Sequence, residues 1–249
     1  MESYQIQLKQ FKNEITRFMM QYKFALNEVE TKIAILQEEF RLLHDYNPIE
    51  HTKSRLKSPE SILKKIKRKM GQDNINLLHI REHIKDIAGI RITCSFIEDI
   101  YRISDMLKLQ RDLTVLEVKD YIKKPKPNGY RSLHLLVEVP IFMSDREEQI
   151  IVEIQIRTIA MDFWASLEHK IFYKYNQAVP MQLIEELKTA ADTAAELDQK
   201  MENLHKEIGQ IKEKNEKEEA QLVINNQQFS LPKEFLQLID SQQSHLDNE

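Results

Sequence analysis

The chain has 249 residues and a formal net charge of −4 at pH 7, with 31% charged residues, one cysteine and only four glycines. This composition excludes a disulfide scaffold, argues against long disordered linkers and favours a helix-rich protein of a reducing cytosol. No apolar run approaches the roughly 18 residues that a membrane span needs, and no secretory signal is visible, so we expect a cytoplasmic protein that does not bind a membrane.

The first predicted element is one long amphipathic helix within residues 1–48 that ends near Asn47-Pro48, because apolar residues recur there at spacings of three and four. A second helix is predicted to begin at Ser58-Pro59, with serine as its N-cap and proline at its first position, and to end near Met70. A short helix is predicted over residues 76–85.

Four strand-like segments follow, rich in isoleucine, valine, leucine and tyrosine. They cover residues 87–96, 114–122, 132–142 and 149–158. Helices are predicted between the first two strands and after the last one, over residues 98–109 and 159–175. This order predicts an α/β (α+β) fold, a mixed β-sheet flanked by helices, with a core over residues 49–175.

Beyond Pro180 the apolar residues keep a strict spacing of three and four up to Ile211, which is the a/d seam of a coiled coil. So narrow a seam on so long a helix suits a partner helix. We therefore expect residues 176–215 to form a C-terminal oligomerisation helix and the protein to be a homo-oligomer. Residues 216–249 are polar and are predicted to form a loosely attached tail.

Two short segments concentrate positive charge in this mildly acidic protein. Residues 51–69 hold eight lysines and arginines against one acid, and residues 119–131 hold five against one acid. This distribution favours a localised phosphate site over general polyanion binding. In the first segment, Arg55 and Lys57 precede a predicted helix N-terminus, whose free N–H groups favour an anion; a solvated basic face is the alternative.

The loop at residues 125–134 combines two prolines, an Asn-Gly turn pair and an aromatic ring. We expect this loop to present Tyr130 as a flat stacking surface, with Lys126 and Arg131 beside it for phosphate. That arrangement suits a guanine nucleotide. A structural hairpin punctuated by proline and glycine is the alternative.

In the last predicted strand, period-2 geometry places Glu153, Gln155 and Arg157 on one face and two isoleucines on the other. Such a polar face indicates a functional surface, with simple solvent exposure as the alternative. Asp86 lies before the first regular strand or is re-aimed by a bulge at Gly89. If Asp86 comes near Glu153, the two carboxylates suit Mg²⁺ and nucleotide phosphates; a turn cap is the alternative role.

Five motifs stand in a recognisable order along the chain. They are residues 50–61, Asp86-Ile-Ala-Gly-Ile-Arg91, Lys126-Pro-Asn-Gly-Tyr130-Arg-Ser-Leu-His134, Glu153-Ile-Gln-Ile-Arg157-Thr and residues 160–170. In residue types and order they resemble the synthetase domain of the RelA/SpoT superfamily, over about residues 20–215. With no hydrolase domain before it and no regulatory domain after it, the chain looks like a stand-alone small alarmone synthetase, leaning towards the RelP-type branch.

The resemblance implies a nucleotidyltransferase-like sheet that transfers pyrophosphate from ATP to the 3′-hydroxyl of GDP or GTP, giving ppGpp or pppGpp and AMP. It implies Mg²⁺ held by Asp86 and Glu153, with Glu153 also accepting the hydroxyl proton. The implied ATP-binding residues are Arg55, Lys57, Ser61, Lys65, Arg68 and Arg91, with Arg55 and Arg91 sandwiching adenine. The implied residues for GDP or GTP are Tyr130, stacked on guanine, and Lys126, His134 and Gln155. The family also suggests a homotetramer.

Two other classes of function compete with this interpretation. A nucleotidyl transferase on the same fold would release pyrophosphate, but such enzymes usually show Gly-Ser followed by paired acids on one strand, and this sequence does not. A non-enzymatic RNA-binding protein would use the basic segments and Tyr130, although the acidic overall balance disfavours it. RNA binding beside catalysis, and the preference for GDP or GTP, stay open from the sequence.

Overall fold

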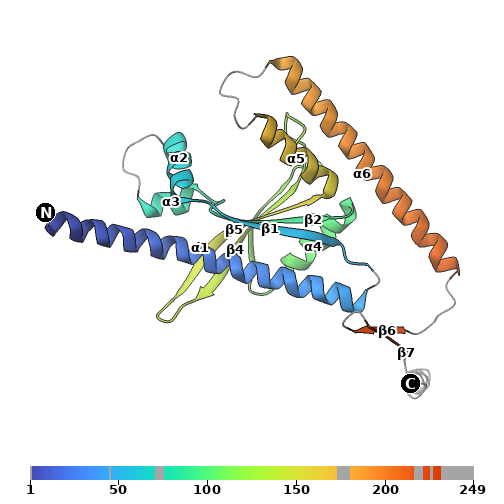
Figure 1. Ribbon diagram of the computed structural model, residues 1–249, viewed down its shortest axis with the longest axis horizontal. Coiled ribbons are helices and arrows are strands. Elements are labelled where there is room, and N and C mark those ends of the chain that lie inside the picture. Colours follow the sequence, from blue (N-terminus) through green and yellow to red (C-terminus); the bar gives the residue numbers. More distant parts are fainter. Residues whose placement is uncertain are drawn as a thin grey trace.

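The computed structural model describes residues 2–44, 46–70, 76–172, 180–215, 221–224 and 227–230. In these ranges a five-stranded mixed sheet has helices on both sides (Figure 1). Its strands are β1 (Ile49–Leu56), β2 (Ala88–Cys94), β3 (Thr114–Asp120), β4 (Leu133–Phe142) and β5 (Glu147–Thr158). The helices are α1 (Glu2–Leu43), α2 (Pro59–Met70), α3 (Leu77–His83), α4 (Ile97–Lys108), α5 (Ile159–Phe172) and α6 (Met181–Asn215).

The helix boundaries follow local signals in the sequence. Ser58 Oγ accepts the Ser61 N–H at 3.3 Å, which confirms the predicted N-cap of α2. Helix α1 ends at Leu43, earlier than predicted, because Pro48 disfavours helical backbone before it and Asn47 instead accepts the N–H of Ile49 at 3.0 Å. The predicted end of the helix over residues 159–175 lies outside the described residues.

The strand order in the sheet is β1-β2-β5-β4-β3, with β2 and β5 parallel and the other pairs antiparallel. Strand β1 was not predicted from the sequence. This strand lies at the edge of the sheet and pairs only with β2, so most of its side chains stay exposed and no hydrophobic alternation marks it. In the segment predicted as a polar tail, β6 (Gln221–Ile224) and β7 (Gln227–Ser230) pair antiparallel, and these strands were also not predicted.

The apolar side chains of the sheet are buried against α1 and α4, while α5 and α6 lie on the other side of the sheet (Figure 1). Ile92 of β2 and Ile154 of β5 are fully buried, as is Val29 of α1. The predicted inward face of the strands is therefore confirmed, and the polar side chains of the same strands are left for the opposite face. None of the helices in the described ranges has the length and hydrophobicity needed to cross a bilayer.

Helix α6 is held against the body by acidic side chains placed at the starts of two other helices. Asp198 Oδ2 accepts the hydroxyl of Thr158 at 2.5 Å, and Thr158 itself caps α5 by accepting the N–H of Met161 at 3.1 Å. Glu202 Oε2 accepts the first N–H of α4, from Ile97, at 3.2 Å. The carboxylate of Glu202 lies at the N-terminus of α4, where negative charge is stabilising, and together with the hydrogen bond between Asp198 and Thr158 it orients α6 on the body.

Replacing Asp198 with asparagine is expected to stabilise the protein by about 1–2 kcal/mol at pH 8. Burial raises the pKa of Asp198 to about 6, and the neighbouring Glu202 adds to the effect. In the unfolded wild type Asp198 ionises near pH 4, so the free energy of unfolding falls as the pH rises from 4 through about 6. The variant keeps an acceptor for the Thr158 hydroxyl but carries no charge, so it avoids this loss. Urea unfolding at pH 4, 6 and 8 measures this, and an advantage that did not shrink towards pH 4 would contradict it.

Candidate active site

One face of the main sheet carries polar residues from adjacent strands. The register places Gln155 of β5 between His134 of β4 and Arg91 of β2, and residues that are directly opposite share a face. Glu153 and Arg157 are the next residues on the same face of β5. Simple solvent exposure does not describe this face, because Arg157 is only 2% exposed and Glu153 is largely covered.

Glu153 lies near the centre of this face and is held by two neighbours. His134 Nδ1 lies 3.3 Å from Glu153 Oε1, and Gln155 Nε2 donates to Glu153 Oε2 at 2.9 Å. Burial by itself raises the pKa of Glu153, but the hydrogen bond and charge of His134 and the hydrogen bond from Gln155 outweigh it and leave the pKa below its ordinary value. Glu153 is therefore an ionised carboxylate with fixed orientation at neutral pH.

A continuous chain of hydrogen bonds leads from Glu153 to Arg157. Tyr130 Oη lies 2.8 Å from His134 Nε2, and Arg157 donates to Tyr130 Oη at 3.1 Å and to Gln155 Oε1 at 2.6 Å. Because the ionised carboxylate of Glu153 can only accept, the proton between the two groups lies on His134 Nδ1, and a neutral His134 then accepts the hydroxyl of Tyr130 at Nε2. The sequence placed Arg157 on the right face but assigned it no role.

The loop before β4 brings Lys126 to an aromatic cluster. Lys126 Nζ lies 4.8 Å from the centre of the Tyr130 ring and 4.7 Å from that of Tyr121, and these two rings meet edge-on at 6.0 Å. Tyr130 is half-buried and packs edge-on against Tyr121 and His134, and its role as a stacking surface for a base stays a prediction. No signal in the sequence distinguished Tyr121 from an ordinary residue at a strand end.

The sequence predicted Arg131 beside Tyr130 as a group for binding phosphate, and the structure corrects this prediction. Its guanidinium instead faces α6 and forms an ion pair of 2.8 Å with Asp192. Ala191, the residue of α6 whose carbonyl accepts from Arg131, lies sixty positions further along the chain. Nothing in the local sequence around Arg131 could reveal such a partner.

Asp86 lies just before β2, and the register of β1 with β2 is regular at Gly89, so no bulge is needed to place it. Its Oδ2 accepts hydrogen bonds from Lys57, which directly follows β1, and from Lys65 of α2, both at 2.6 Å. Burial raises the pKa of Asp86, but these two ammonium groups more than offset it and keep the pKa below its ordinary value. Burial also lowers the pKa of Lys57, which is 9% exposed.

Asp86 and Glu153 are the residues here that suit a divalent cation. Asp86 lies two residues before β2, whose Gly89 is directly opposite Glu153 of β5, so both carboxylates belong to the same region of the sheet. Asp86 Oδ1 is buried, and no hydrogen-bond partner for it exists within the described residues. The described part of the chain contains no group of three or more side chains that could hold a metal alone. A pair of carboxylates with substrate phosphates and water is a typical Mg²⁺ site, so the residues fit this ion.

The predicted adenine-binding arginines lie on neighbouring strands. Arg55 of β1 is opposite Gly89 and Lys53 is opposite Arg91, so both arginines share the face that carries Glu153. Arg55 is exposed, whereas Arg91 pairs with Asp162 of α5 at 3.0 Å. Asp162 also accepts from Arg157 at 3.3 Å, so it was a missed site residue, although it stands inside the motif at 160–170.

The remaining predicted ATP-binding residues follow one side of α2. Ser61, Lys65 and Arg68 recur at helical spacing next to the buried stripe formed by Ile62 and Ile66. Ser61 and Lys65 are half-buried and Arg68 is exposed. The structure brings Lys65 to Asp86, whereas Ser61 accepts a hydrogen bond from the Ser58 hydroxyl at 2.9 Å and Arg68 lies one turn beyond Lys65 on the same basic surface.

Comparisons with known proteins agree with this arrangement. Residues 54–178 match the family model described as a region found in RelA/SpoT proteins. The GTP pyrophosphokinase YwaC of Bacillus subtilis is 55% identical over 201 residues, which cover 81% of this chain and 93% of that protein. The crystal structure of small alarmone synthetase 2 from Bacillus subtilis is 54% identical, with a TM-score of 0.69 and coverage of 79% and 98%.

Small alarmone synthetase 1 of the same organism has been solved with nucleotides bound. With its product pppGpp it is 38% identical to this chain, with a TM-score of 0.72 and coverage of 78% and 98%. With AMPCPP the identity is 35%, the TM-score 0.67 and the coverage 80% and 99%. The predicted fold class is thereby confirmed. The chain belongs to the RelA/SpoT family and has the fold of its small alarmone synthetases.

Proposed function

We propose that this protein is a GTP pyrophosphokinase, which moves the β,γ-pyrophosphate of ATP to the 3′-hydroxyl of GDP or GTP. The observation that carries the proposal is the position of Glu153, an ionised carboxylate between a basic cluster around Asp86 and an aromatic cluster around Tyr130. A relative that is 55% identical bears the same name, and this chain covers 93% of it. The products are ppGpp or pppGpp, with AMP.

The basic cluster is the proposed ATP site. Arg55 and Arg91 extend from adjacent strands on one face, a geometry that suits two guanidinium planes on either side of adenine. The ATP phosphates then meet the positive groups of Lys57, Lys65 and Arg68 and the hydroxyl of Ser61 near the start of α2. Because Asp86 holds Lys57 and Lys65 by ion pairs, ATP and Asp86 compete for these two ammonium groups in the absence of a cation.

The aromatic cluster is the proposed acceptor site. Guanine stacks on Tyr130, and Lys126, which lies over the ring, moves aside to bind phosphate. His134 and Gln155 both contact Glu153, so a hydroxyl held by them lies within reach of that carboxylate. Two nucleotides bound on one sheet face place donor and acceptor for in-line attack, which is the main catalytic requirement of phosphoryl transfer.

In the proposed reaction Glu153 accepts the proton of the 3′-hydroxyl while the oxygen forms a bond to the β-phosphorus of ATP. The bond from that phosphorus to the α,β-bridging oxygen breaks, and AMP leaves with the electron pair. Mg²⁺ held by Asp86 and Glu153 supplies charge neutralisation when bound. Since the pKa of Glu153 is low, it is a weak base whose effect depends on position, and His134 and Gln155 keep it oriented.

Changing Tyr130 to alanine is expected to raise the KM for GDP about tenfold to a hundredfold and to leave the KM for ATP within about twofold, because stacking on a base contributes about 1–3 kcal/mol. Tyr130 to phenylalanine keeps the ring and loses only the contacts of its oxygen with His134 and Arg157, so it should recover most of the acceptor affinity. Steady-state kinetics with each nucleotide varied in turn measures both effects. Equal changes for ATP and GDP would contradict the assignment.

The test of the reaction is to incubate pure protein with Mg²⁺, ATP and either GDP or GTP and to separate the nucleotides by anion exchange. Equal amounts of AMP and of a more highly phosphorylated guanosine establish pyrophosphate transfer, and the two acceptors give the preference. Free pyrophosphate would indicate the competing nucleotidyl transfer. Bound ATP without any product would overturn the enzymatic assignment in favour of a nucleotide-binding regulator.

We also propose that the protein is a homo-oligomer, a tetramer on the family pattern. In each subunit, residues 49–175 are the catalytic core and residues 176–215 carry the subunit contacts. Supporting this, the seam residues of α6 remain exposed on the single chain. They are Leu197, Met201, Leu204, Ile208 and Ile211. A buried free thiol at Cys94 suits the reducing cytoplasm that we propose as its compartment. Light scattering of the pure protein measures the oligomeric state, and a monomer would contradict it.

A further inference from the structure

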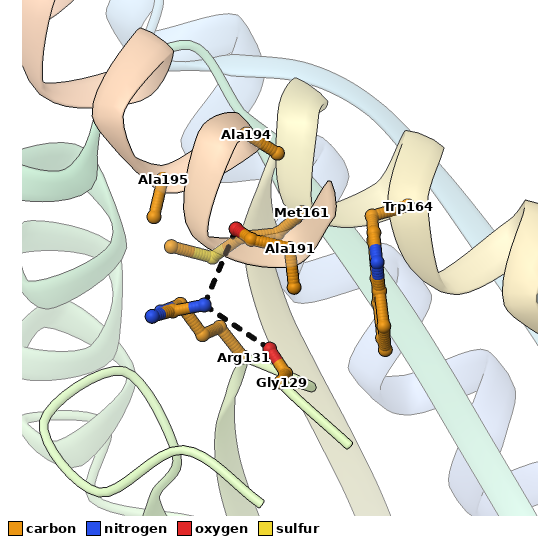
Figure 2. Close-up of a pocket in the computed structure, with 7 residues that line it drawn as sticks. All are labelled: Gly129, Arg131, Met161, Trp164, Ala191, Ala194 and Ala195. Atoms are coloured by element: carbon orange, nitrogen blue, oxygen red, sulfur yellow. Dashed lines mark hydrogen bonds between the residues drawn. The ribbon is translucent and has the colours of Figure 1, made fainter. Parts of the chain in front are cut away.

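The loop that carries Lys126 and Tyr130 rests on helix α6 through the side chain of Arg131 (Figure 2). One end of its guanidinium forms an ion pair with Asp192 at 2.8 Å. The other end donates to the carbonyl of Ala191 at 3.3 Å and to the carbonyl of Gly129 in the loop itself at 3.2 Å. Arg131 therefore joins the loop backbone to the helix backbone, and it is only 18% exposed.

The backbone of the loop also approaches α6 more closely than any side chain allows. Gly129 has a φ of 89°, and a β-carbon placed on it would lie 2.5 Å from the β-carbon of Ala191. Ala194 and Ala195 complete a contact so tight that the cavity left beside Arg131 is about 10 Å³, which is at most the space of one water molecule (Figure 2). The loop and the helix thus have one mutual position.

Hydrogen bonds inside the loop carry this position to the proposed acceptor site. The N–H of Gly129 donates to the carbonyl of Lys126 at 2.8 Å, and the N–H of Lys126 donates to the carbonyl of Tyr130 at 3.1 Å. The side chain of Asn128 accepts the N–H of Tyr130 at 3.2 Å. A shift of Gly129 on α6 therefore moves Lys126 and Tyr130 together.

We propose that Arg131 is a positioning residue, which clamps the acceptor loop onto α6 and so sets the affinity for the guanine nucleotide. The inference rests on the proposed function in naming the ligand of this loop. Arg131 acts through Lys126 and Tyr130 and touches no reacting atom. Within the described residues Arg131 contacts no residue of the proposed ATP site, which Tyr130 reaches only through Arg157 and Asp162, so we expect the affinity for ATP to depend on Arg131 far less than the affinity for GDP.

Arg131→Met keeps the aliphatic stem and removes the charge and the hydrogen bonds. It is expected to raise the KM for GDP roughly tenfold, which corresponds to about 1.4 kcal/mol, with the KM for ATP unchanged within twofold. Arg131→Lys, which keeps the ion pair with Asp192, should recover part of the loss. The matched control is Arg146→Met, which removes a half-exposed loop arginine that also forms ion pairs but lies in the β4–β5 hairpin.

A second pair of variants tests the contact without touching Arg131. The variants are Ala191→Val and Ala190→Val. Ala191 faces Gly129, whereas Ala190 is exposed on the same turn of α6, and the change from alanine to valine has the same helix-propensity cost at both positions. Only Ala191→Val should weaken the binding of GDP. Equal effects of the two valine variants on the KM for GDP would refute the clamp. It would also be refuted if Arg131→Met had the wild-type unfolding temperature and the wild-type KM for GDP.

Binding measured without turnover separates this inference from the proposed reaction. Trp164 is the only tryptophan of the chain, and its Nε1 donates to Leu187 of α6 at 3.1 Å beside Gly129 and Ala191. GDP should change its fluorescence in the wild type, and Arg131→Met should need about tenfold more GDP for the same change. If the wild type binds GDP in this way but makes no product, the reaction fails and the clamp stands. If it turns over while Arg131→Met titrates like the wild type, the clamp fails and the reaction stands.

Discussion

Glu153→Gln is expected to lower kcat by roughly 10³-fold, within the range of 10² to 10⁴ that a positioned general base contributes. Glutamine has nearly the same shape and keeps partners in His134 and Gln155, but it cannot accept a proton and carries no charge for a cation. Nucleotide binding should therefore persist while turnover is lost. Product formation at saturating ATP and GDP, together with calorimetric titration of each nucleotide, measures the two effects separately.

The matched control for this experiment is Glu147→Gln, at the first residue of the same strand, where the side chain is exposed. It makes the same chemical change outside the proposed site, so its kcat should equal that of the wild type. Near-normal turnover of Glu153→Gln would remove Glu153 from the mechanism. Loss of nucleotide binding in step with turnover would instead make it a binding residue.

Asp86→Asn is expected to lower activity by about 10²-fold or more at low Mg²⁺, because it removes one of two carboxylates that suit the ion. Asp86→Asn should have the opposite effect on the affinity for ATP when no divalent ion is present. In the wild type Lys57 and Lys65 are both bound to Asp86 Oδ2, and the variant leaves their charges uncompensated for the phosphates. We therefore expect metal-free ATP to bind several-fold more tightly to the variant.

This pair of effects is measured by activity against Mg²⁺ concentration and by ATP titration in the presence of a chelator. Asp145→Asn provides the control, since it removes an exposed carboxylate from an ion pair with Arg146 outside the site. A variant with unchanged Mg²⁺ dependence would show that Asp86 is only a turn residue. Weaker metal-free ATP binding would mean that Asp86 orients the lysines for the phosphates, contrary to the competition proposed above.

The sequence motifs predicted a large part of the candidate site because they lie on regular elements. Alternation in β5 places Glu153 and Gln155 on one face whatever the rest of the chain does, and the helical spacing of α2 does the same for Ser61 and Lys65. The Ser58 cap is equally local. The edge strand β1 was missed for a related reason, since a strand with few buried side chains lacks the alternation by which strands are recognised.

The sequence by itself determined which residues carry charge, which faces are apolar and where the helices begin, because these properties depend on neighbours within a turn or two. Only the tertiary structure decided the partners that are distant in the chain. It attached Arg131 to Asp192 rather than to a ligand, packed Tyr121 against Tyr130, and made Asp162 common to Arg91 and Arg157. Such pairings depend on strand order and helix docking, which bring together side chains whose separation along the chain carries no periodic signal.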